Sequence, residues 1–447
     1  MVNAFGFATE GDGQTHHTGL NFHFAETESP QRFEIRVNDD FLDLTLRKVR
    51  DYRPSRSFFP NWTVEGPPNG VLKGRANYWA NEYNWRQAEE TMNEEFDHYA
   101  TTVPGYGTYS APIPLHFVHK ESKNEGAVPL LLVHGWSSTH HEWSSAIKKL
   151  SQNGEKSPAP TQPGLGAKEV GVAFDALMQQ LGYSEYGIVS TDIGWAIAMS
   201  MVEHLSQNII GHFTDFFFAM PTPSDSARQA NNETTEGENE YLAALKEFAK
   251  RHFAYATVQN QKPGLLAAIL AGSPVGMAAW LWDLKHGNSD GYAFTHEEII
   301  HERDVDVDSR SSGLPSEKKS DVATGVTAWG YLDGPFPDLA KFPLLPRSGA
   351  ERVANVVYFK NYETGGHWPA FNQPDQVRHI SLIISESKER GGDVRVYLES
   401  AYARSLNNDA WDLHGQVGRV FVSQRPNGTD RLCNSRLIEL LIDRFKL

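Results

Sequence analysis

The sequence predicts an α/β fold in which a mostly parallel sheet carries helices on both faces. "AVPLLLVHGW" (127–136) and "YGIVS" (186–190) are short, continuous apolar runs, as expected of strands that are buried on both faces. Between them, "KEVGVAFDALMQQLGY" (168–183) repeats apolar residues at helical spacing. Strands that alternate with helices in this way are typical of parallel sheets.

Three later segments continue the strand pattern: "TDFFFAMP" (214–221), "TGVTAW" (324–329) and "NVVYFK" (355–360). The alternation stops between about 221 and 322, where a helical, aromatic-rich insert is predicted to form a cap. Before the first buried strand, "PIPLHFVHK" (112–120) alternates apolar and polar residues like a half-buried strand.

The N-terminal part is predicted to be helical. Leu42, Leu46 and Val49 share one face of a helix that Asn38 or Asp39 would cap. Residues 1–30, by contrast, are polar and glycine-rich, and we expect a loose arm in which His16, His17 and His23 are solvated. "SSGLPSEKKS" (311–320) is predicted to be a loop, and "RLIELLIDRFKL" (436–447) a helix.

The composition excludes several classes of function. The chain has 447 residues and a net charge of −15, whereas nucleic acids and anionic membranes attract basic faces. The single cysteine, Cys433, allows no disulfide within the chain and no cysteine-based metal site. The N-terminus lacks the pattern of a signal peptide, and no apolar run is long enough to span a membrane. We therefore expect a cytoplasmic protein without metal or cofactor.

A candidate nucleophile follows the strand "YGIVS". In Ser190-Thr191-Asp192-Ile193-Gly194, small residues lie two positions before and two positions after a carboxylate, between a strand and a helix. This spacing matches a nucleophile elbow, a turn so tight that its flanking residues must be small. The N-terminus of the following helix favours an ionised carboxylate. The alternative, an aspartate that only caps the helix, is equally compatible with so short a pattern.

Two distant motifs favour the catalytic interpretation. "VHGW" (133–136) follows the first buried strand, and the amides of Trp136 and Ile193 would then form an oxyanion hole. "NYETGGHWPAFNQPD" (361–375) places His367 in a glycine-rich loop after the last apolar strand. A histidine in this position, after a nucleophile and an acid in chain order, is a candidate general base.

The acid of the site is expected in "GYLDGPFPDLAK" (330–341), which offers Asp333 and Asp338. Asp338 is slightly favoured because Phe336 and Pro337 precede it, whereas Asp333 lies nearer to the end of the strand. Either residue is also compatible with a simple role in a turn.

An aspartate nucleophile restricts the chemistry. A carboxylate that attacks an sp³ carbon forms an alkyl ester, and water activated by a histidine–carboxylate pair can hydrolyse that ester. This chemistry suits epoxides or alkyl halides. It does not suit peptides or esters, for which serine or cysteine is the usual nucleophile.

Long motifs make the chain similar to the microsomal-type epoxide hydrolases between about Phe33 and Ile384. The motifs are "YWANEYNWRQAEETMN" (78–93), "PLHFVHKES" (114–122), "PLLLVHGW" (129–136), "TDIGW" (191–195), "YATVQNQKP" (255–263), "SPVGMAAW" (273–280), "PRSGAERVANVVYF" (346–359) and "GGHWPAFNQPD" (365–375). The resemblance implies an α/β-hydrolase fold with a helical cap and an N-terminal helical domain. It also implies Asp192 as nucleophile, His367 as general base and Tyr255 as the lid tyrosine that hydrogen-bonds the epoxide oxygen.

The chain departs from this family in three places. The region that would carry a second lid tyrosine has none, and neither Tyr292 nor Tyr331, which flank it, matches the motif. The segment between Leu150 and Val170 offers no apolar run, so we expect a sheet strand of the family to be missing. Ile193 stands where the family commonly has tryptophan.

The resemblance and the patterns divide the chain into six parts. These are an arm (1–30), an N-terminal epoxide hydrolase domain (31–125), the first part of the core (126–220), a helical cap (221–321), the second part of the core (322–387) and a C-terminal extension (388–447).

The leading hypothesis is an epoxide hydrolase, or a biosynthetic enzyme that opens an epoxide, with a small apolar epoxide and water as substrates. A homodimer is compatible with the sequence. One alternative is a haloalkane dehalogenase, in which Trp136 would hold the halide; Ile193 removes the usual second donor. The other alternative is a scaffold that binds an apolar ligand without catalysis.

Overall fold

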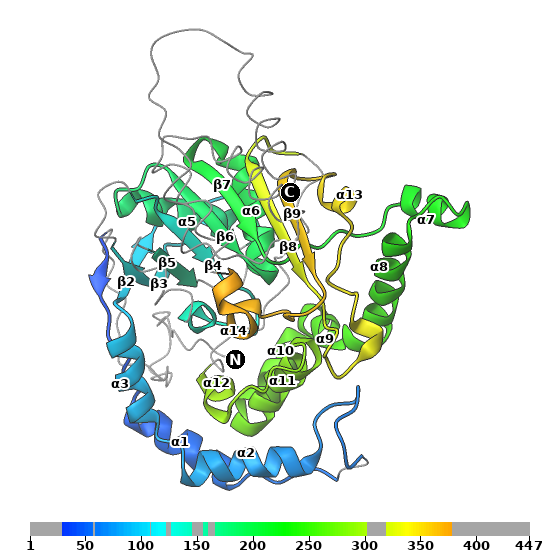
Figure 1. The fold of residues 1–447 in the computed structure, drawn as a ribbon. Coiled ribbons are helices and arrows are strands. Elements are labelled where there is room, and N and C mark those ends of the chain that lie inside the picture. The colour runs from blue at the N-terminus through cyan, green and yellow to red at the C-terminus, as the bar shows by residue number, and fades with distance from the viewer. Residues whose placement is uncertain are drawn as a thin grey trace, which may run out of the picture. The chain divides into compact units, whose positions relative to one another are not determined.

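The computed structural model describes residues 29–56, 59–107, 109–121, 127–144, 155–159, 166–301 and 319–377, with only the backbone for 155–159 and 301 (Figure 1). Three predicted features lie outside these residues. They are the arm with its three histidines, nearly all of the loop at 311–320 and the C-terminal extension with its predicted helix.

A nine-stranded sheet has the order β1-β2-β3-β5-β4-β6-β7-β8-β9. Its strands are β1 (Gln31–Arg32), β2 (His98–Val103), β3 (Ile113–Lys120), β4 (Leu130–Val133), β5 (Glu155–Ala159), β6 (Tyr186–Ser190), β7 (Ile209–Thr214), β8 (Ala323–Trp329) and β9 (Asn355–Tyr362). From β5 to β9 in this order all neighbours run parallel, and the other pairs are antiparallel. The predicted mostly parallel sheet is confirmed.

The helices follow the predicted alternation. They are α1 (Asp39–Arg50), α2 (Asn69–Asn81), α3 (Trp85–Glu95), η1 (His140–Trp143), α5 (Ala167–Gln180), α6 (Asp192–His204), η2 (Ser206–Asn208), α7 (Pro223–Ala230), α8 (Glu236–Glu247), η3 (Phe248–His252), α9 (Ala254–Gln261), α10 (Pro263–Ala271), α11 (Pro274–Asn288), α12 (His296–His301), η5 (Pro337–Leu339), α13 (Arg347–Ala350) and α14 (Pro369–Asn372). The cap of α1 is the predicted Asn38, whose side chain accepts a hydrogen bond of 2.8 Å from the amide of Asp40.

The prediction of a missing sheet strand between Leu150 and Val170 is wrong. Strand β5 occupies this segment and pairs antiparallel with β3 and parallel with β4. Strand pairing uses backbone amides and carbonyls, so it requires an extended backbone rather than apolar side chains. The polar sequence "EKSPA" therefore fills the place although hydrophobicity gives no sign of it.

The predicted position of the strand at 214–221 is also wrong. Strand β7 covers Ile209–Thr214, so "TDFFFAMP" begins where the strand ends. Gly211 and His212 obscure the apolar pattern of "IIGHFT", but His212 is fully buried and its Nε2 shares a 2.8 Å hydrogen bond with the Ser190 hydroxyl. A buried polar side chain thus interrupts the apolar pattern of the strand, which explains the wrong position in the prediction.

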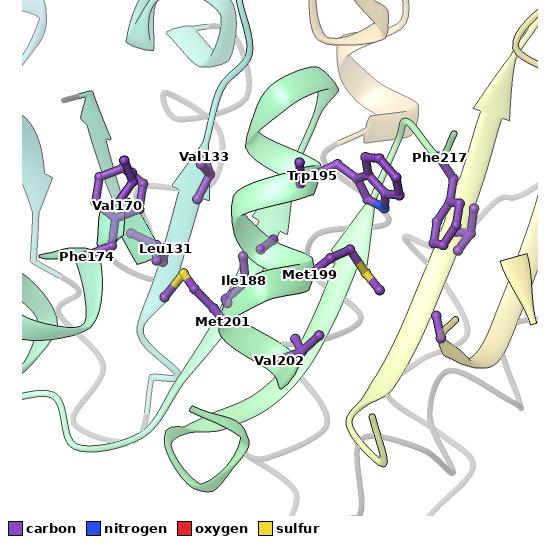
Figure 2. Packing of buried hydrophobic residues seen from close by; sticks show 14 of the residues in the cluster. Leu131, Val133, Val170, Phe174, Ile188, Trp195, Met199, Met201, Val202 and Phe217 are labelled. Atoms are coloured by element: carbon purple, nitrogen blue, oxygen red, sulfur yellow. The ribbon is translucent and has the colours of Figure 1, made fainter. Parts of the chain in front are cut away.

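Helix α6 is buried because it packs against the sheet, with α5 at its side. Figure 2 shows Met201 near Leu131 of β4 on the side of α6 toward Phe174 of α5, and Trp195 beside Phe217. The Trp195 and Phe217 rings are 4.9 Å apart between their centroids. Burial on several sides explains why the helix lacks a polar face. It also anchors the residue that begins the helix.

The helices between β7 and β8 are fastened to the N-terminal helices by polar and aromatic contacts. Arg75 of α2 is fully buried, with its guanidinium 3.5 Å from the ring centroid of Trp282, and burial lowers its pKa to about 9. The Tyr78 hydroxyl donates a 2.8 Å hydrogen bond to Glu297. The N-terminal helix α2 therefore contacts α11 and α12. These two helices lie between β7 and β8, as does α9.

Candidate active site

The turn between β6 and α6 has the geometry of a strained elbow. Asp192 adopts a left-handed backbone, with φ of +46°, which costs roughly 1–3 kcal/mol in a residue other than glycine. A Cβ on Gly194 would lie 2.4 Å from the carbonyl oxygen of Val133, and one on Gly135 would lie 2.2 Å from Cβ of Asp192. Both glycines are therefore required for the close approach of the two turns.

Two backbone amides interact with the Asp192 carboxylate. The amide of Trp136 donates a 2.9 Å hydrogen bond to Oδ1, and the amide of Ile193 stabilises the same carboxylate. Burial opposes ionisation, but His367 and these two amides outweigh burial and hold the pKa of Asp192 below its usual value. The site therefore contains an ionised carboxylate next to two aligned donors.

His367 faces the other oxygen of this carboxylate. Its Nε2 lies 3.2 Å from Asp192 Oδ2. The loop that carries His367 follows β9 and is tied to the end of α11, because the His367 amide donates a 2.7 Å hydrogen bond to the carbonyl of Asn288. Asp290 accepts a further bond of 2.6 Å from the amide of Gly365. The helices between β7 and β8 thus help to position the histidine.

Tyr255 lies in α9, against the side chain of Trp136. Its ring stacks on Trp136 with 5.5 Å between centroids and 7° between planes. Burial, followed by the charge of Asp192, raises the pKa of the Tyr255 phenol. The phenol therefore keeps its proton and is available as a hydrogen-bond donor near the carboxylate.

The two candidate acids lie in exposed positions. Asp338, in η5, forms an ion pair with Arg251, with 3.2 Å between Oδ2 and the guanidinium nitrogen. The backbone amide of Asp333 donates a 2.7 Å hydrogen bond to Asp290. Neither carboxylate forms an ion pair with His367 among the contacts of the described residues.

Two buried residues near Asp192 were not recognised as site residues from the sequence. Asp215 follows β7, is 6% exposed, and interacts electrostatically with both His367 and Asp192. Tyr331 follows β8 and is fully buried; burial, Tyr255 and then Asp192 raise the pKa of its phenol. One signal for Asp215 was available, because "STD" (190–192) and "FTD" (213–215) both place Thr-Asp at the end of a strand.

The comparisons with known proteins agree with this architecture. Residues 30–143 match the family described as "Epoxide hydrolase N terminus". A provisionally named epoxide hydrolase of Stigmatella aurantiaca (strain DW4/3-1) is 27% identical over 382 residues, which is 78% of this chain and 82% of the relative. The chain is a relative of the epoxide hydrolases. The predicted class of enzyme, an epoxide hydrolase, is confirmed by these matches.

Solved structures confirm the predicted α/β-hydrolase fold. An epoxide hydrolase of Aspergillus niger matches with a TM-score of 0.68 and 21% identity, over 80% of this chain and 96% of that structure. The juvenile hormone epoxide hydrolase of the silkworm Bombyx mori matches with a TM-score of 0.68 and 20% identity, over 82% of this chain and 96% of that structure.

Two further observations apply to the part of the chain that the structure describes. No helix there combines the length and the apolar character that are needed to cross a membrane. No group of three or more histidine, cysteine, aspartate or glutamate side chains there has an arrangement that could hold a metal ion.

Proposed function

We propose that the protein hydrolyses an epoxide to a vicinal diol through an ester of Asp192. The observation that carries the proposal is that the two oxygens of the Asp192 carboxylate have different partners. Oδ1 accepts a hydrogen bond from the Trp136 amide, while Oδ2 lies 3.2 Å from His367 Nε2. A carboxylate held in this way has one oxygen oriented and the other available as a nucleophile.

In the first step, Asp192 Oδ2 attacks an epoxide carbon and the carbon–oxygen bond of the ring breaks. The negative charge that develops on the leaving oxygen needs a donor, and the Tyr255 phenol would transfer its proton to that oxygen. The position of Tyr255 on Trp136 and its raised pKa support this role, because the donor must be protonated before the ring opens. The product of the step is a hydroxyalkyl ester of Asp192.

In the second step, His367 removes a proton from water and the resulting hydroxide attacks the carbonyl carbon of the ester. Negative charge then collects on Oδ1, which the amides of Trp136 and Ile193 would stabilise. Collapse of this intermediate breaks the bond between Cγ and Oδ2, and Oδ2 leaves as a hydroxyl group of the diol with the proton from His367. An oxygen of water replaces Oδ2 in the carboxyl group. That group gives its proton to the Tyr255 phenolate, which restores the Asp192 carboxylate and the Tyr255 phenol.

The division into an N-terminal domain (31–125), a core in two parts (126–220 and 322–387) and a cap (221–321) is part of this proposal. The helices between β7 and β8 support it, because they supply Tyr255 and hold the loop of His367. The contact of Arg75 with Trp282 joins the proposed N-terminal domain to the proposed cap.

A single-turnover reaction in ¹⁸O-labelled water tests the mechanism. The full chain, in excess over a styrene-oxide-type epoxide, is digested after reaction and the peptide with Asp192 is weighed. We expect label in the Asp192 carboxylate, and loss of turnover in Asp192→Ala. An unlabelled peptide with diol still formed would contradict the covalent step, and turnover of alkyl halides instead of epoxides would favour the dehalogenase alternative.

A further inference from the structure

Asp215 lies at the same edge of the sheet as the nucleophile. Strands β6 and β7 are parallel neighbours with Ser190 opposite Thr214, so Asp215 is the first residue beyond the pair. Its amide donates a 3.3 Å hydrogen bond to the carbonyl of Ser190. This register holds the backbone of Asp215 next to that of Thr191, the residue that precedes Asp192.

The carboxylate of Asp215 is buried without a matching partner. Within the described residues, neither of its oxygens has a hydrogen-bond partner of ordinary geometry, although the Thr191 hydroxyl lies nearby and favours the ionised form. Burial raises its pKa to about 7; the charge of His367 lowers it and the charge of Asp192 raises it. An unpaired buried carboxylate is unfavourable for folding, so its presence requires an explanation.

Phe216, the residue that follows Asp215, contacts the imidazole of His367. The ring of Phe216 packs edge-to-face on that imidazole, with 5.2 Å between centroids and 82° between planes. Because Nε2 faces Asp192, Nδ1 is the nitrogen that remains for a carboxylate to orient. Asp215 also lies between Asp192 and His367 in the sequence, which is the chain order of nucleophile, acid and histidine that follows an elbow of this kind.

We infer that Asp215 is the positioning carboxylate of His367, in place of Asp333 or Asp338, during hydrolysis of the Asp192 ester. The inference rests on the proposed function. When water gives its proton to Nε2, the imidazole becomes a cation, and the ionised Asp215 stabilises that cation without taking the proton itself.

Formation of the ester strengthens this arrangement. Alkylation removes the negative charge of Asp192, which is one cause of the raised pKa of Asp215. The pKa of Asp215 therefore falls in the intermediate, and its carboxylate is more fully ionised when water is activated. At the same stage His367 loses the charge of Asp192 as a partner, which leaves Asp215 as the carboxylate that acts on it.

The candidate acids of the sequence pattern have other contacts. Asp338 is engaged by Arg251, and the residue is exposed. Asp333 is exposed as well, and its amide is bound by Asp290. A carboxylate in water is a poor stabiliser of an imidazolium, because solvent screens its charge.

The test compares Asp215→Asn with two matched controls, Asp338→Asn and Asp333→Asn. Each full-length variant is mixed in excess with a styrene-oxide-type epoxide, and intact mass follows the formation and the decay of the ester. For Asp215→Asn we expect ester formation within a few-fold of the parent rate and ester hydrolysis slower by roughly 10²–10⁴-fold. Both controls should hydrolyse the ester within a few-fold of the parent rate.

The pH dependence of ester hydrolysis separates positioning from a structural role. If Asp215 acts through the charge of the imidazolium, its loss should change the pH dependence of ester hydrolysis and not the rate alone. Asp215→Glu should recover part of the rate. Parent-like hydrolysis in Asp215→Asn, or slow hydrolysis in either control, would overturn the inference. Absence of any ester on Asp192 in the parent protein would instead refute the proposed function.

Discussion

The strands β7 and β8 end in two contrasting carboxylates. Asp215, just after β7, is 6% exposed, has no hydrogen-bond partner of ordinary geometry in the described chain, and has a raised pKa. Asp338, nine residues after β8 ends, is exposed and forms an ion pair with Arg251. The contrast teaches that the environment of a carboxylate, rather than its neighbours in the sequence, determines how strongly its charge can act on a partly buried histidine.

The largest expected effect comes from combining variants of Asp215 and His367. His367→Gln should slow hydrolysis of the ester by at least roughly 10²-fold, because the water loses its base. If Asp215 acts only through this base, adding Asp215→Asn to that variant should cause no further loss. Ester lifetimes measured by intact mass test this expectation, with Asp338→Asn/His367→Gln as the matched control. Losses that add up would mean that Asp215 acts independently of the histidine.

The next effect concerns the free energy of unfolding. The pKa of Asp215 is raised to about 7 in the folded protein, so the folded state binds more protons than the unfolded state between roughly pH 4 and pH 7. The stability that depends on this group is present below pH 4 and is lost as pH rises through about 7. Asp215→Asn should therefore be more stable than the parent protein at pH 8, by on the order of a few kcal/mol.

Denaturant unfolding of both proteins at pH 8, 6 and 4.5 measures this difference. We expect it to shrink as the pH falls, because the parent carboxyl then becomes neutral in the folded state. Asp338→Asn serves as the control, since an exposed ion pair should give little change over the same range. A less stable Asp215→Asn protein at pH 8 would mean that a favourable contact of Asp215 outweighs its desolvation.

The smallest effect is expected at the end of β8. Arg251→Ala removes the partner of Asp338, and an exposed pair of this kind contributes at most about 1 kcal/mol. Thermal unfolding should change slightly at low salt and less at high salt, because salt screens exposed charges. Ester hydrolysis should stay within a few-fold of the parent rate. A large loss of hydrolysis would mean that Asp338 takes part in catalysis, and it would weaken the contrast with Asp215.

Much of the site could be predicted from the sequence where the chemistry depends on local backbone geometry. The elbow at Asp192 needs small flanking residues, and Gly194 meets that need in the structure through its 2.4 Å approach to Val133. The amides of Trp136 and Ile193 were also predictable, because backbone donors are positioned by the turns themselves. The roles of Tyr255 and His367 in catalysis stay predictions.

The buried carboxylate of Asp215 could not be predicted in the same way. The predicted strand at 214–221 would contain Asp215. In the structure β7 ends at Thr214, so Asp215 lies just beyond the strand at the edge of the sheet. Whether a polar residue such as His212 is buried depends on what it contacts, and its Nε2 shares a hydrogen bond with Ser190 of the neighbouring strand β6. Only the assembled sheet contains this information.

By itself, the sequence determined the alternation of strands and helices and the elbow that carries Asp192, because turns, caps and periodicity are local properties. The tertiary structure alone decided that polar β5 joins the sheet, where β7 ends, and that Asp215 is buried near His367 while Asp338 faces solvent. The physical reason is that pairing of strands and burial of charge depend on residues far apart in the chain.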